Sequence, residues 1–83
     1  MVNFSANNLI LISAQTRKTF TRFIMRDQYT KRTYLFYDFE KSHQFERGIP
    51  YVVTGKINSA NNQLFLVLET SRPDKKNAAL KGL

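Results

Sequence analysis

Two neighbouring segments of the chain combine aromatic rings with positive charges. The first runs from Lys18 to Arg26 with the sequence KTFTRFIMR, and the second runs from Lys31 to Phe39 with the sequence KRTYLFYDF. Alternate residues of a β-strand point to opposite faces, so each segment can give one face to a core and present rings and cations on the other. Aromatic rings stack on bases and cations bind phosphates. The two segments therefore predict a surface that binds nucleic acid.

The alternation separates the first segment into two faces. Arg22 and Arg26 lie on the same face, and arginine is rarely buried without a partner. We therefore expect this face to be exposed. The opposite face is then expected in the core, and it carries Thr21, Phe23 and Met25.

The same reasoning applies to the second segment, where the choice of face is harder. Arg32 and Asp38 mark the polar ends of one face, which also carries Tyr34 and Phe36. These ends favour that face as the exposed one. If the alternation is shifted by one residue, the rings that face outward are instead Phe23, Tyr37 and Phe39.

The length, hydrophobic content and net charge limit the classes of protein to which this chain can belong. The chain has 83 residues, enough for one domain with a small core, and its 42% hydrophobic content is typical of a folded protein. Its net charge of +7 favours polyanionic partners, which include nucleic acid, anionic lipid and acidic proteins. Many small basic proteins are charged only for solubility, so the net charge alone does not predict nucleic-acid binding. It agrees with the prediction made from the two aromatic-basic segments.

Several kinds of chemistry find no support in the composition. Cysteine is absent and His43 is the single histidine, so disulfides, thiolate metal sites and multi-histidine metal sites are excluded within one chain. We expect His43 to be a surface or capping residue. Asp38 and Glu40 could bind Mg²⁺, but Lys31, Arg32 and Lys41 lie nearby and explain them more simply as charge partners. No phosphate loop or catalytic triad is recognisable, so we expect no enzyme and no cofactor.

The chain contains no apolar run of the roughly 18 residues that span a bilayer, and its first residues lack the pattern of a secretory signal. We therefore expect a cytoplasmic protein without membrane contact. The polar end after Ser71 reads as a solvated basic tail, although Lys75, Lys76 and Lys81 could form a nucleic-acid arm.

Five short strands are expected, followed by this tail. Residues 1–8 read as a flexible lead-in, or Phe4 pins them to the core. The break at Glu40–Gly48 is expected to be a short helix or a turn, with Ser42 as N-cap. Gly55 suggests a bulge, a bend or a close approach of another backbone. The strands are expected near residues 9–13, 19–26, 31–39, 49–57 and 63–70.

This order resembles the OB-fold, a small five-stranded Greek-key barrel. The resemblance is most specific at Gly48 and at the strand Tyr51-Val52-Val53-Thr54-Gly55-Lys56-Ile57, which is similar to the fourth strand of many OB-fold single-strand-binding proteins. It covers residues 9–70 and implies an all-β domain at 9–71 between the lead-in 1–8 and a flexible basic tail 72–83. The first strand lacks the internal glycine that lets many OB strands curve, so Ser13-Ala14 or a bulge must do so. SH3-like and Sm-like barrels rank lower.

The resemblance places the two segments on the second and third strands, which form the floor of the binding face in OB-folds. Three rings are then expected to stack on bases: Phe20, Tyr34 and Phe36. Arg22 and Arg26 are expected to pair with phosphates, and the groove edges are expected to carry Lys18, Lys31, Arg32 and Lys56. The remaining rings are assigned mainly to the core: Tyr37, Phe39, Phe45 and Phe65.

The predicted function is non-enzymatic binding of single-stranded nucleic acid, DNA before RNA, in replication or recombination. Richness in Asn, Lys, Ile, Phe and Tyr suggests an AT-rich coding sequence, as in phages and mobile elements of low-GC bacteria. The alternative is an OB-like accessory subunit that docks a polymerase, primase or helicase and binds nucleic acid only weakly. Exposed strand edges are compatible with a homodimer.

Overall fold

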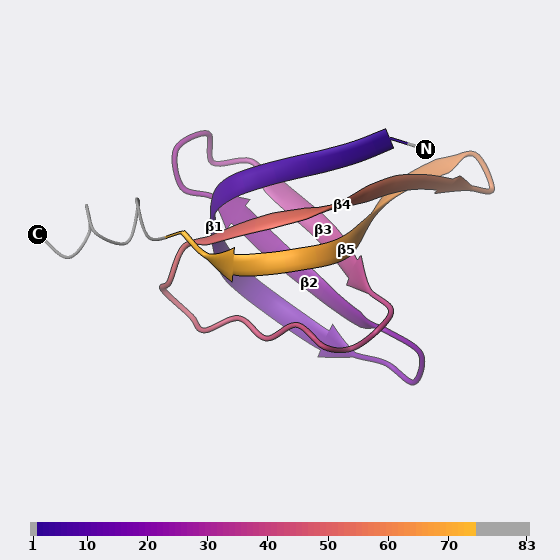
Figure 1. The fold of residues 1–83 in the computed structure, drawn as a ribbon, viewed down its shortest axis with the longest axis horizontal. Helices are drawn as coiled ribbons and strands as arrows, with labels where there is room; N and C mark the ends of the chain where they lie inside the picture. The colour runs from indigo at the N-terminus through magenta and orange to yellow at the C-terminus, as the bar shows by residue number, and fades with distance from the viewer. Residues whose placement is uncertain (1, 75–83) are drawn as a thin grey trace, which may run out of the picture.

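The computed structural model describes residues 2–74, and five strands close into a β-barrel (Figure 1). The order around the barrel is β1-β2-β3-β5-β4, with β4 closing on β1. Only β3 and β5 run parallel; the other neighbours are antiparallel. The strands are β1 Val2–Thr16, β2 Thr21–Asp27, β3 Thr33–Asp38, β4 Tyr51–Ala60 and β5 Gln63–Pro73.

The first strand is longer than expected and begins at Val2 instead of Leu9. Its first half pairs with β4 from Val2 to Ala6, and its second half pairs with β2 from Leu9 onward. Phe4 packs against the core, as the second reading of residues 1–8 proposed. Residues 2–8 are therefore not a flexible lead-in: they belong to β1, and residues 2–6 pair with β4.

A bend at Asn8 lets one strand serve two partners. Asn8 is buried and adopts φ 56°, a left-handed conformation that asparagine tolerates. Its N–H donates to Asp74 Oδ2 at 3.0 Å, and its carbonyl accepts from the Gln28 N–H at 3.1 Å. A bulge between Leu11 and Ser13 adds curvature. The bend and the bulge therefore do the work that an internal glycine does in other curved strands.

The turn between β2 and β3 sets how these two strands pair. Asp27 Oδ1 accepts the N–H groups of Tyr29 and Thr30, and the Lys31 N–H donates to the Asp27 carbonyl at 2.8 Å. Lys31 adopts φ 64°, which closes the turn. The resulting register pairs Arg22 with Tyr37 and Phe23 with Phe36.

The β4–β5 hairpin ends in a two-residue turn at Asn61 and Asn62, narrower than the expected turn at 58–62. Both residues have positive φ, 52° and 63°, the requirement of a type I′ turn. Asparagine reaches this conformation more readily than other side chains except glycine. The hairpin extends to one side of the barrel, on the side where the N-terminus lies (Figure 1).

The core combines inward-facing residues of every strand. Phe36 is fully buried; it stacks on Phe4 with ring centroids 5.5 Å apart and lies opposite Phe23. Phe36 therefore cannot stack on bases, which corrects its assignment as an exposed ring. The buried apolar residues are Leu9, Phe23, Met25, Phe36, Tyr51, Val53 and Leu68.

An irregular segment, residues 39–50, connects β3 to β4, and the part of the chain between Val2 and Asp74 contains no helix. The expected short helix is therefore not confirmed, and Ser42 is not the N-cap of a helix. Asp38 organises this segment instead: its carboxylate accepts from the N–H of Lys41 at 3.1 Å and from that of His43 at 2.9 Å. Within residues 2–74 no helix has the length and hydropathy needed to cross a membrane.

Gly55→Ala is expected to destabilise the barrel by about 1–3 kcal/mol, because there is no room for a methyl group. A Cβ at this position would lie 1.9 Å from the Val67 carbonyl oxygen and 2.8 Å from the Phe4 ring. Thermal unfolding followed by circular dichroism should show a melting temperature lower by about 4–8 °C for each kcal/mol. Ser59→Ala, at an exposed position of the same strand, is the control and should change little. Equal melting temperatures for both variants would contradict the close approach.

Candidate nucleic-acid interface

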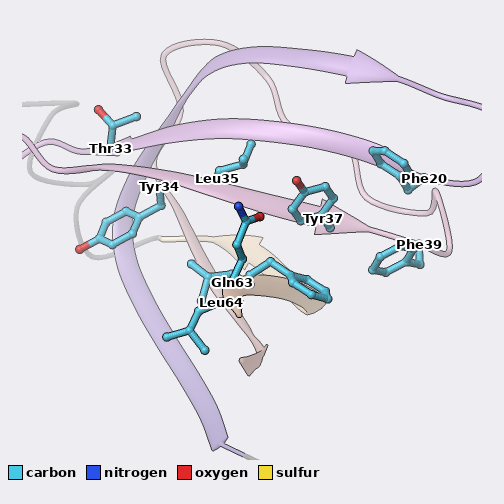
Figure 2. Close-up of a pocket in the computed structure, with 10 residues that line it drawn as sticks. Phe20, Thr33, Tyr34, Leu35, Tyr37, Phe39, Gln63 and Leu64 are labelled. Carbon is cyan, nitrogen blue, oxygen red and sulfur yellow. The ribbon is translucent and has the colours of Figure 1, made fainter. Parts of the chain in front are cut away.

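A groove of about 550 Å³ opens on the outer surface between the beginnings of β3 and β5 (Figure 2). These strands pair only at Phe36–Leu66 and Tyr37–Val67, so no ladder joins them further towards their first residues. Side chains line this space instead. We call it the aromatic groove, and its lining residues are Phe20, Thr33, Tyr34, Leu35, Tyr37, Phe39, Gln63, Leu64, Phe65 and Leu66.

Four rings form a connected cluster in the aromatic groove, outside the core. Tyr37 is central, with ring centroids 5.4 Å from Phe20, 6.1 Å from Phe39 and 5.7 Å from Phe65. Phe20 and Phe39 lie 5.9 Å apart. Figure 2 shows Phe20, Tyr37 and Phe39 together at one end of the groove. Phe39 is 49% exposed, so the cluster presents ring surface to solvent.

The structure changes which rings of the second segment face outward. Tyr37 and Phe39 line the groove, whereas both were assigned to the core. Tyr34 lines the opposite end of the groove (Figure 2). It is half-buried, and its ring stacks on that of Phe36 with centroids 6.0 Å apart. Phe20, another predicted stacking residue, also lines the groove.

The exposed face of the second segment was assigned wrongly because Arg32 and Asp38 were taken to mark it, and the structure explains the error at each residue. Asp38 is buried because its carboxylate accepts two backbone N–H groups, so it marks the inner face. Arg32 precedes β3, which begins at Thr33, so the alternation does not constrain it. The first segment follows the prediction: Thr21, Phe23 and Met25 are buried, and Arg26 is exposed.

Arg22 and Arg26 flank the groove from the neighbouring strand. Arg22 is paired across the sheet with Tyr37, and Arg26 is paired with Thr33, and both of these partners line the groove. Directly paired residues of antiparallel strands share a face. The two arginines are therefore adjacent to the ring cluster, and the Arg22 guanidinium is oriented by a hydrogen bond to Gln15 Oε1.

The predicted lysines and Arg32 lie around the groove at different positions. Lys18 is exposed in the connection before Phe20, and Lys31 and Arg32 are exposed in the turn before Thr33. Lys56 lies further away on β4, where it pairs with Val67, the neighbour of Tyr37. Its ammonium group lies 3.5 Å from Glu69, the only salt bridge among residues 2–74. Lys56 is therefore partly neutralised, whereas Lys18, Lys31 and Arg32 form no salt bridge with the described residues.

The carboxylates near these cations are used by the backbone. Asp27 caps the β2–β3 turn and Asp38 holds the segment 39–50, and within residues 2–74 neither forms a salt bridge. This corrects the expectation that Asp38 is a charge partner of Lys31, Arg32 and Lys41. Positive charge beside the groove consequently remains available to a ligand. Over the described part of the chain, no cluster of three residues suits a metal ion.

Sequence reasoning missed the contribution of the β4–β5 hairpin. Gln63, Leu64 and Phe65 line the groove, and Leu64 is 77% exposed. Residues 64–68 form a continuous apolar run, but only Leu68 of this run is buried. The available sequence signal for this exposed hairpin was the pair Asn61 and Asn62, because two adjacent asparagines favour a tight hairpin turn. Both are exposed at its tip.

The fold is similar to that of a known protein, although the sequence matches none. No family model and no curated protein matches the sequence. A chain in the solved structure of a replication protein A heterotrimer bound to ssDNA superposes with a TM-score of 0.66 at 12% sequence identity. The match covers 94% of this chain and 62% of that chain, so this chain spans less than two thirds of its neighbour. The closed five-stranded barrel and this superposition together show that the chain has the OB fold.

Proposed function

We propose that this protein binds single-stranded nucleic acid, DNA before RNA, by stacking bases in the aromatic groove. The observation that carries the proposal is the cluster of Phe20, Tyr37, Phe39 and Phe65, which lies outside the core in a groove open to solvent. Exposed apolar surface of this kind marks an interaction site in soluble proteins. Each stacked base contributes about 1–3 kcal/mol.

The location of the groove supports the same conclusion. OB-folds bind oligonucleotides on the face of the second and third strands, between the β1–β2 and β4–β5 connections. Here Phe20 ends the β1–β2 connection, Tyr37 belongs to β3, and Gln63 follows the β4–β5 turn. The groove therefore occupies the surface that this fold uses for oligonucleotides.

The charges near the groove fit a phosphate backbone. Arg22 and Arg26 lie beside the rings, and Lys18, Lys31 and Arg32 lie at the connections on either side. A single strand that stacks its bases on the rings would place phosphates towards these cations. Few polar side chains line the groove, so we infer weak sequence preference, because base identity is read mainly through hydrogen bonds.

We place this activity in replication or recombination, as a non-enzymatic role in the cytoplasm. The shape similarity to a chain of a replication protein A heterotrimer bound to ssDNA supports that placement. The composition rich in Asn, Lys, Ile, Phe and Tyr favours a phage or a mobile element as the setting.

A labelled oligo-dT titration at several salt concentrations tests the proposal. If Lys18, Arg22, Arg26, Lys31 and Arg32 each bind one phosphate, log K should fall with log salt at a slope of roughly −3.5. Affinity should then drop about a hundredfold between about 50 mM and about 200 mM salt. Arg22→Ala should reduce the slope by about 0.7, and Arg72→Ala, at the far end of β5, should leave it unchanged. The absence of binding even at low salt would refute the proposed function.

A second candidate function rests on the exposed apolar residues at the groove. Leu35, Phe39 and Leu64 are all more than a third exposed, and a protein partner could cover them. The protein would then be an accessory subunit of a polymerase, primase or helicase with weak affinity for nucleic acid. Leu64→Ser separates the two functions. It removes exposed apolar surface without adding a charge or removing a ring, so it should weaken complex formation with such an enzyme in size-exclusion chromatography and, under the first proposal, leave oligonucleotide binding largely intact.

A further inference from the structure

A second groove lies at the end of the barrel that the segment 39–50 covers. Its volume is about 440 Å³. The barrel side contributes residues of β1 and β2, and the segment 39–50 contributes the opposite wall. We call it the loop groove, and its lining residues are Leu11, Ala14, Thr16, Thr21, Phe23, Lys41, His43, Gln44 and Phe45.

We propose that the loop groove is a second nucleobase-binding site, which takes one base of the same strand that occupies the aromatic groove. This inference rests on the proposed function and adds residues to it. Two half-buried rings in the groove, His43 and Phe45, are parallel within 8°, with centroids 6.5 Å apart. Parallel rings in an open groove offer a flat group two surfaces of the same orientation, which suits stacking.

Both rings are held in place before any ligand arrives. His43 Nδ1 shares a hydrogen bond of 2.7 Å with Ser71 Oγ, and the His43 N–H donates to Asp38. Phe45 makes edge contacts with Phe23 and with Tyr51, each with centroids 4.8 Å apart. Rings that are already oriented lose little freedom on binding, so stacking retains more of its free energy.

Polar groups around the rings fit the rest of a nucleotide. Lys41 supplies a cation for a phosphate, and its backbone is fixed because Asp38 accepts its N–H. Thr16 and Gln44 are exposed and carry hydrogen-bonding side chains for a base edge or a sugar. Leu11 and Phe23 contribute apolar surface on which a base could pack. This combination of apolar walls and a few polar groups is the usual composition of a small-ligand site.

The two grooves are neighbours, so one strand can reach both. Phe20 lines the aromatic groove and the next residue, Thr21, lines the loop groove. On the other side, Phe39 lines the aromatic groove and Lys41 lines the loop groove. A strand that passes Phe39 therefore meets Lys41 and then the rings of His43 and Phe45.

Affinity measured against oligonucleotide length tests this inference. A labelled oligo-dT series from about 4 to about 16 nucleotides covers the site sizes of single OB folds. His43→Ala should lower affinity for the longest oligonucleotides about fivefold or more and leave the shortest unaffected. His43→Phe keeps a ring and should restore binding. Lys41→Ala should weaken the longest oligonucleotides, whereas Arg72→Ala, which removes the same charge outside both grooves, should not.

Nuclear magnetic resonance of the His43 ring protons gives a readout that does not depend on the variants folding. Addition of a long oligo-dT should shift these signals. If Tyr37→Ala weakens binding while His43→Ala leaves every length unaffected and the ring signals do not move, the inference is overturned and the proposed function stands. That is also the result expected if the loop groove takes an apolar side chain of a protein. If no oligonucleotide binds the wild-type protein, both the proposed function and this inference fail.

Discussion

Phe36→Ala is expected to lower the free energy of unfolding by about 3–5 kcal/mol. Phe36 is fully buried, stacks on Phe4 and Tyr34, and lies opposite Phe23. Its removal leaves a cavity that the closed barrel cannot collapse to fill. A domain of this size has a total stability of only about 4–12 kcal/mol, so the variant should be largely unfolded at elevated temperature. Urea denaturation followed by circular dichroism measures the loss.

Leu35→Ala is the matched control, because Leu35 is the preceding residue of β3 and is 38% exposed on the other face. This substitution should lower the free energy of unfolding by about 1 kcal/mol or less. The comparison tests the alternation of β3 directly. A stable Phe36→Ala variant beside an unfolded Leu35→Ala variant would mean that the strand faces the opposite way, with Phe36 outside.

The double variant Tyr37→Ala, Phe39→Ala should weaken binding of single-stranded DNA by at least about 30-fold while the barrel remains folded. The two rings stack with centroids 6.1 Å apart in the aromatic groove, where Tyr37 is half-buried and Phe39 is exposed. Loss of a stacking ring costs about 1–3 kcal/mol of binding free energy per base. Two losses of about 1 kcal/mol each raise the Kd about 30-fold, which is the lower limit expected here. Fluorescence anisotropy with labelled oligo-dT measures the affinity, and circular dichroism verifies the fold.

Tyr29→Ala serves as the control for the loss of a ring. Tyr29 is 72% exposed in the β2–β3 turn and does not line the groove. It should retain the affinity of the wild-type protein. Equal loss of affinity in Tyr29→Ala and in the double variant would point to a general effect of surface rings and would contradict a binding role for this groove.

Local sequence patterns predicted much of the fold. Five strands in this order were expected, as was a bulge, a bend or a close backbone approach at Gly55, and the resemblance to the OB-fold implied the barrel. The faces of β2 were assigned correctly, because Arg22 and Arg26 share one face and arginines remain near solvent. The first strand was started too late, because the polar residues before Leu9 gave no sign that β4 would pair with them.

The faces of β3 could not be assigned from local patterns. Rings occupy both faces of this strand, so hydrophobicity does not distinguish them. The turn at Gln28–Lys31 decides the question, because it pairs Phe23 with Phe36 and forces both to the same side. A change of one residue in the length of this turn would move the whole set of β3 rings to the other face.

The sequence by itself determined that rings and cations lie on adjacent strands of a small barrel. The tertiary structure alone decided which rings form the surface. Asp38 lies inside, where it accepts the N–H groups of Lys41 and His43, and the alternation of β3 places the preceding residue, Tyr37, on the outer face. Phe65 joined from β5, a strand more than twenty residues further along the chain, because β5 inserts beside β3. Local alternation describes a single strand, whereas register and strand order depend on turns and on buried hydrogen bonds that join distant segments.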